Sequence, residues 1–166
     1  FTLTANTTAD DNIAIGFNAL AANTTGTQNI AIGKYALDGS TTANNNTAVG
    51  HLALTANTTG HSNTALGSEA LDANTTARYN TAIGYASLGA NTTGEENTAV
   101  GRQALITNTT GSYNVAMGVN TLYNNNGNNN TAVGNGALSA NTTGAQNTVL
   151  GGAAANAITT GIENVA

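Results

Sequence analysis

Residues 80–96 read NTAIGYASLGANTTGEE and residues 97–113 read NTAVGRQALITNTTGSY, so one pattern returns after 17 residues. The asparagine that opens the pattern recurs along the whole chain, with a single shortened step of 16 residues between Asn114 and Asn130. We number the positions of the repeat as columns 1 to 17 from this asparagine, and the consensus is N-T-A-(I/V)-G-x-x-A-L-x-A-N-T-T-G-x-x. A fixed internal period predicts an architecture in which each repeat stacks on the next.

The length of the repeat indicates the fold class. Helical-hairpin repeats need about 33 residues or more, whereas 17 residues suit one coil of a parallel β-solenoid. Columns 2–4 are β-prone and predict a first short strand; further short strands are expected in columns 7–9 and 12–14. Glycines in columns 5 and 15 are expected to form the corners, because glycine adopts positive φ at little cost. The predicted fold class is therefore all-β, a parallel β-solenoid (β-roll) of 17-residue coils.

The repeat also predicts the domain organisation. We expect a single array over residues 1–166, with nine full coils over residues 12–163 and partial coils over 1–11 and 164–166. We further expect this array to be a fragment of a longer fibre.

With three cations and a net charge of −5 the chain has no basic surface for nucleic acid. No apolar run approaches the length that spans a bilayer, so no membrane insertion is expected.

Side-chain alternation along the first strand places columns 2 and 4 on one face and column 3 on the other. Column 4 is aliphatic or methionine in every full repeat, so we expect it to point inward and to meet the leucine of column 9. Column 3 would then face outward as a ridge of small side chains. This ridge is either a solvent-exposed face or a close inter-chain interface, and the second is favoured because slender cores gain stability by oligomerising. The candidate interface residues are Ala14, Ala31, Ala48, Ala65, Ala82, Ala99, Ala116 and Ala132.

The asparagines of columns 1 and 12 are predicted to stack into ladders that hydrogen-bond neighbouring coils. The ladder of column 1 comprises Asn12, Asn29, Asn46, Asn63, Asn80, Asn97, Asn114, Asn130 and Asn147. The N-T-T triplet that starts at column 12 also matches the acceptor pattern for N-glycosylation. The candidate acceptors are Asn6, Asn23, Asn57, Asn74, Asn91, Asn108 and Asn141. The ladder is the favoured interpretation, because sugars on coils about 4.8 Å apart would be crowded.

The ionisable and aromatic residues fall only in columns 6, 7, 10, 16 and 17, which are the columns where the repeats differ. We call these the variable columns and expect them to face outward. An active site needs dissimilar groups that converge, and a metal site needs several ligands close together. The sequence therefore predicts no catalytic, cofactor-binding or metal-binding residue, no cofactor and no enzymatic activity. Any recognition is expected to occur on the variable columns.

The motif N-T-A-(I/V)-G-x-x-A-L resembles the N-S-x-A-(I/V)-G repeats of trimeric autotransporter adhesin heads. It is also similar to the NTAxGxxAL repeats of bacterial surface and phage tail-fibre-like proteins. The resemblance covers the whole chain, although the 17-residue period is longer than that of the adhesins, with N-T-T-G as the addition. It implies a left-handed β-roll, a homotrimer, an extracellular location on a cell surface or virion fibre, and attachment to a host-surface or matrix ligand.

These observations predict a structural extracellular fibre or adhesin segment that provides rigid spacing and multivalent attachment. One alternative is a filament subunit whose exposed coil ends pair with one another, by end-to-end self-assembly. A second alternative is an ice-binding β-solenoid. It is disfavoured because a flat threonine array needs threonines two residues apart on one strand, whereas Thr24 and Thr25 are adjacent.

Overall fold

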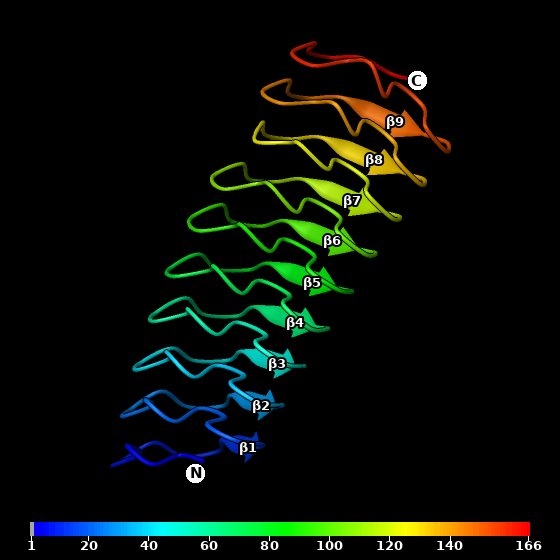
Figure 1. Ribbon diagram of the computed structural model, residues 1–166. Helices are drawn as coiled ribbons and strands as arrows, with labels where there is room; N and C mark the ends of the chain where they lie inside the picture. Colours follow the sequence, from blue (N-terminus) through cyan, green and yellow to red (C-terminus); the bar gives the residue numbers. More distant parts are fainter. Residues whose placement is uncertain (1) are drawn as a thin grey trace.

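The computed structural model describes residues 2–166 and is an all-β parallel solenoid, as predicted (Figure 1). The strands stack in sequence order into one nine-stranded parallel sheet along one side of the molecule. They are β1 (Ile13–Ile15), β2 (Ile30–Ile32), β3 (Thr47–Val49), β4 (Thr64–Leu66), β5 (Thr81–Ile83), β6 (Thr98–Val100), β7 (Val115–Met117), β8 (Thr131–Val133) and β9 (Thr148–Leu150). Identical columns pair across neighbouring strands, as Ala82 does with Ala99. No helix long and apolar enough to cross a membrane occurs in residues 2–166.

Each coil has one strand, and the strands predicted for columns 7–9 and 12–14 are absent from the described coils. Tight turns replace them: the backbone N–H of Ala36 donates to the carbonyl of Gly33 at 3.3 Å, and that of Ser40 donates to Leu37 at 3.1 Å. Tyr35 and Leu37, in columns 7 and 9, have φ of 61° and 51°. A strand needs consecutive extended residues, so left-handed conformations at these columns exclude one there.

Glycine in column 5 forms a corner, as predicted. Gly84 has φ of +126°, and a Cβ added there would lie 2.7 Å from the carbonyl oxygen of Gly101 in the next coil. Column 15 acts differently: its glycines have no positive φ, and two of its members are the buried alanines Ala43 and Ala77. Column 15 therefore requires a small residue because neighbouring coils pack closely there, and the predicted positive-φ corner is wrong.

The apolar part of the solenoid interior consists of columns 3, 8 and 9. Leucines such as Leu88 and Leu105 in column 9 are fully buried, as predicted. Column 4 was expected to be inside, but Ile15 is 60% exposed and Leu66 is 46% exposed. The strand therefore has the opposite orientation to the predicted one, with column 3 inward and columns 2 and 4 outward.

This orientation overturns the predicted inter-chain role of the column-3 alanines. Seven of them are fully buried inside the coils and Ala14 is partly buried, so none forms an outer ridge. The residues whose predicted inter-chain role is wrong are Ala14, Ala31, Ala48, Ala65, Ala82, Ala99, Ala116 and Ala132. The reason is volume, because the leucine of column 9 fills the narrow coil and leaves room for little more than a methyl group. In the coil of residues 147–163 the two columns exchange sizes: column 3 has the larger Val149, and column 9 has the smaller Ala155.

Candidate functional surfaces

The predicted ladder of column 1 is present and runs through the interior. From Asn29 onward the backbone N–H of each column-1 asparagine donates to Oδ1 of the preceding one, and in every coil but that of Asn80 its Nδ2 amide donates to the same oxygen. For Asn97 these bonds to Asn80 measure 2.9 Å and 3.1 Å, and Nδ2 also donates to the carbonyl of Gly111 at 2.9 Å. A buried amide with every polar atom bonded stabilises the stack without a desolvation penalty.

Column 12 forms a second ladder, which bears on the predicted glycosylation sites. Nδ2 of Asn74 donates to Oδ1 of Asn57 at 2.8 Å and to the carbonyl of Ala77 at 3.2 Å. Six of the seven candidate acceptors are fully buried: Asn23, Asn57, Asn74, Asn91, Asn108 and Asn141. In all six, the Nδ2 atom that would carry the sugar donates to the carbonyl of column 15 inside the coil, so glycosylation at these positions is incompatible with the fold. Asn6 is exposed, and its Nδ2 donates to the carbonyl of Ala9 at 3.1 Å.

The column-12 ladder is interrupted at two places. Ser40 stands where the amide of the next coil would bond Asn23, and both Oδ1 of Asn23 and Oγ of Ser40 are buried without a partner. Ile158 stands where an amide would bond Asn141, and Oδ1 of Asn141 is likewise unpaired. Each interruption therefore removes the donor for the preceding coil, which is a cost that a continuous ladder avoids.

The outer face of the sheet is formed by columns 2 and 4, and we call it the outer sheet face. Column 4 is an unbroken file of aliphatic or thioether side chains, all exposed or half-buried: Ile15, Ile32, Val49, Leu66, Ile83, Val100, Met117, Val133 and Leu150. Nine strands spaced about 4.8 Å apart make this file roughly 40 Å long. A contiguous apolar strip on an otherwise polar surface is typical of an interaction site.

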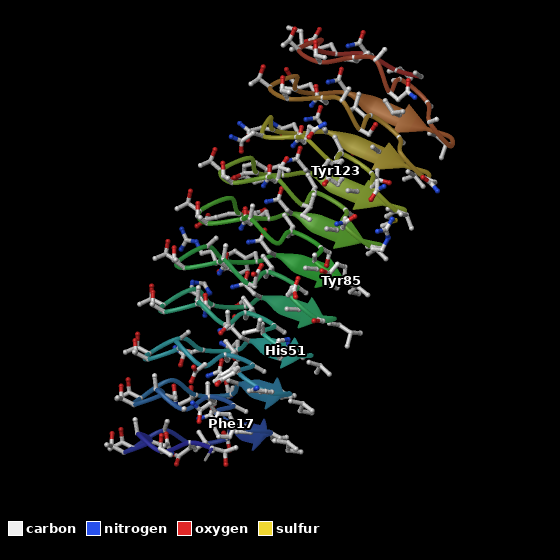
Figure 2. The ribbon with its side chains drawn as sticks, viewed as in Figure 1. Phe17, His51, Tyr85 and Tyr123 are labelled. Atoms are coloured by element: carbon white, nitrogen blue, oxygen red, sulfur yellow. The ribbon has the colours of Figure 1, made fainter. Side chains whose placement is uncertain are left out.

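The variable columns lie on the coil surface and bring residues from neighbouring coils together. Phe17 and Tyr35 meet edge to face at 5.5 Å, and Nζ of Lys34 lies 5.1 Å from the centroid of the Tyr35 ring. Phe17, His51 and Tyr85 follow one another along the stack, and Tyr123 lies farther along it (Figure 2). Adjacent coils therefore combine their variable side chains into small surface clusters.

A second cluster joins columns 16 and 17. Arg78 pairs with Glu95 at 2.9 Å, and its guanidinium lies 6.0 Å from the centroid of the Tyr79 ring. His61 packs edge to face against the same ring at 5.2 Å. Exposed ion pairs of this kind contribute little to stability, so this cluster is not what holds the coils together.

Carboxylates gather at columns 7 and 10 of the coil of residues 63–79. Burial raises the pKa of Asp72, and the neighbouring charge of Glu69 raises it further. The pKa of the exposed Tyr85 is raised mainly by its hydrogen bond to Glu69 and then by the negative charge of that residue. In residues 2–166, no three His, Cys, Asp or Glu residues lie close enough together to hold a metal ion.

The threonines of columns 13 and 14 have different roles. Hydroxyl groups in column 13 bond the next coil, as Thr92 does to the carbonyl of Thr109 at 3.0 Å. Column-14 threonines such as Thr93 are exposed. The hydroxyl of Thr110 in this column is an exception, because it donates to Oδ1 of Asn126 at 3.2 Å.

Sequence reasoning missed two surfaces. The outer sheet face was missed because the strand was placed the wrong way round. The clusters were missed because they join residues 17 apart, although the period itself was a signal that could have found them.

Comparison with known protein families, curated proteins and solved structures found no match to this chain.

Proposed function

We propose that this chain is a structural segment of an extracellular fibre or adhesin, in which copies associate side by side through the outer sheet face. The observation that carries the proposal is the unbroken apolar file of column 4. Retaining large aliphatic groups such as Ile83 and Val100 at the surface of every coil is costly unless a partner covers them.

The repeat suits lateral association of identical chains. Every coil contributes the same outward pair of columns 2 and 4, so the contact area grows in proportion to the number of coils. Stability in such arrays is the sum of coil and neighbour terms, and a slender coil gains from an added layer of contacts. We propose a homotrimer, the state that the resemblance to trimeric adhesin heads implies.

In this assembly the variable columns remain outside and are repeated along a rigid rod. Their clusters, such as Arg78 with Glu95 and Tyr79, would be displayed several times per particle. Multiple weak contacts on one rod give strong attachment through effective concentration, so the fibre needs no catalysis to hold a host-surface or matrix ligand.

Light scattering coupled to size exclusion tests the assembly. We expect the chain to elute as a trimer, and we expect Val100→Asp to shift it toward the monomer because a carboxylate would be placed in the contact. Thr93→Asp adds the same charge at an exposed column-14 position, and we expect it to leave the trimer intact. A monodisperse monomer at about 100 μM would overturn the proposal. Long polymers in electron micrographs would favour the filament alternative.

A further inference from the structure

A groove of about 370 Å³ lies on the loop side of two adjacent coils, and its walls differ from the rest of the array. It is lined by Asn120, Tyr123, Asn124, Asn135, Gly136, Ser139 and Ala140. These residues occupy columns 6, 7, 10 and 11, so the groove is separate from the outer sheet face. Its volume falls in the range of small-ligand sites, which is about 300–1,000 Å³.

Two departures from the repeat create this groove. Column 7 carries a side chain in the other full repeats but is glycine at Gly136, where an added Cβ would meet nothing within 4 Å. Column 10 carries its largest side chain, Tyr123, in the coil below. The space left by the absent side chain of Gly136 therefore lies beside the aromatic ring of Tyr123. Hydrogen bonds between the two coils hold them in register.

The backbone around the groove is fixed. The hydroxyl of Thr107 donates a hydrogen bond to the carbonyl of Tyr123 at 2.8 Å, and Nδ2 of Asn124 donates to the carbonyl of Ser139 at 3.1 Å. The N–H of Gly136 donates to the carbonyl of Val119 at 2.9 Å. A ligand would therefore meet a preformed surface and would not have to order it.

One residue of the lining also has a buried amide oxygen without a hydrogen-bond partner. Of the four buried side-chain atoms without a partner in residues 2–166, three belong to the interruptions of the column-12 ladder. The fourth is Oδ1 of Asn120, where no ladder is interrupted. Because this oxygen is enclosed, a ligand donor would reach it only if the Asn120 side chain turned toward the groove, so the proposal rests on the exposed lining instead.

The chemistry of the lining indicates the class of ligand. It offers one aromatic ring, three amides and one serine hydroxyl, and none of its residues is acidic or basic. Aromatic faces pack against the C–H faces of sugar rings, while amides and hydroxyls match sugar hydroxyl groups as donors and acceptors. We propose that this groove binds a neutral carbohydrate, with Tyr123 as the stacking platform and the polar side chains of the lining, Asn124, Asn135 and Ser139, as hydrogen-bond partners for sugar hydroxyl groups.

A glycan array of neutral and sialylated oligosaccharides, followed by calorimetric titration of the strongest neutral glycan to millimolar concentration, tests the proposal. Gly136→Gln would fill the groove, and Gln103 shows that the same column accepts glutamine at positive φ. We expect Gly136→Gln to abolish binding and Tyr123→Ala to weaken it by at least about tenfold.

Matched variants separate a specific loss from general damage. Tyr113→Ala removes another tyrosine, 54% exposed and outside the groove, and Thr93→Gln adds an amide at an exposed position; both should bind as the parent does. Circular dichroism should show that all four variants keep the fold. The proposal is overturned if no neutral glycan binds, or if binding survives Gly136→Gln in a folded protein. It does not depend on the fibre role, because scattering reports assembly and calorimetry reports the groove.

Discussion

Columns 3 and 4 are consecutive residues of every strand, yet their side chains have opposite surroundings. Ala99 is fully buried in the coil, while Val100 beside it faces outward and is half-buried. The larger apolar group is thus the exposed one, in contrast to an ordinary core. The comparison teaches that the space inside a coil, and not hydrophobicity alone, decides which face of a strand is buried.

The largest expected effect comes from making the same substitution on both sides of this comparison. Ala99→Asp would place a carboxylate in the interior without a partner, and we expect a loss of at least about 3–5 kcal/mol in unfolding free energy. Val100→Asp should cost under about 1 kcal/mol, because its carboxylate reaches water.

Chemical denaturation followed by circular dichroism measures both variants, at a protein concentration below that at which copies associate. Equal losses would show that the two columns do not differ in burial, which would contradict the fold orientation described above.

The next effect concerns the polar part of the interior. Asn97→Ala would remove the side-chain bonds to Asn80 and Gly111 and would leave the N–H of Asn114 without its 3.0 Å bond. We expect a loss of about 3 kcal/mol, since several buried polar groups lose partners together. Asn156→Ala, at an exposed position, is the control and should change stability by less than about 0.5 kcal/mol. Chemical denaturation measures the unfolding free energy of both variants. Similar losses of stability for Asn97→Ala and Asn156→Ala would argue against a stabilising ladder.

A smaller effect of opposite sign is expected where the column-12 ladder is broken. Ser40→Asn would supply donors for Oδ1 of Asn23 and for the carbonyl of Ala43. Asn74 already makes the equivalent bonds beside Ala77, so the amide fits next to an alanine in column 15. We expect stability to rise by about 1 kcal/mol, measured as a higher midpoint of thermal unfolding. Thr42→Asn, on the exposed column 14, should leave the midpoint unchanged, and a gain there as large as that at Ser40 would remove the ladder as its cause.

Sequence alone predicted the features that depend on the period. The parallel stack, the column-1 and column-12 ladders, and the buried leucines of column 9 follow from identical residues recurring after 17 positions. Stacked identical amides pair their hydrogen-bond donors and acceptors with one another, whatever path the rest of the coil follows. These features were therefore insensitive to errors in the predicted strands.

The features that failed depend on the cross-section of the coil. Orientation of the strand was inferred from the size of column 4, but the available width is set by turns at positive φ, such as Leu105, that β-propensity does not register. One signal was present: Val149 and Ala155 exchange volume within one coil, as two side chains that share an interior must. The groove likewise needed the structure, because it joins Tyr123 to the absent side chain of Gly136.

The smallest expected effect tests the outer surface through its charge. Burial raises the pKa of Asp72 above the ordinary value of an aspartate, so the folded state favours the protonated form. The stabilisation that protonation gives is fully present below the unfolded pKa and is lost as pH rises through the folded value. Asp72→Asn should therefore be more stable than the parent at pH 7 and equal to it near pH 3. Because solvent screens this partly exposed group, the gain should be under about 0.5 kcal/mol.

The dependence on Glu69 makes this prediction specific. Its charge is the second cause that raises the pKa of Asp72, so replacing it with glutamine should reduce the benefit of Asp72→Asn at pH 7. Thermal unfolding of the four combinations at both pH values gives the coupling between the two sites. A gain that is independent of pH would assign the effect to packing, and a gain unaffected by Glu69→Gln would leave burial as the only cause. In either case the outer columns tolerate charge at a small cost, whereas at Ala99, inside the coil, the same carboxylate should disrupt the fold.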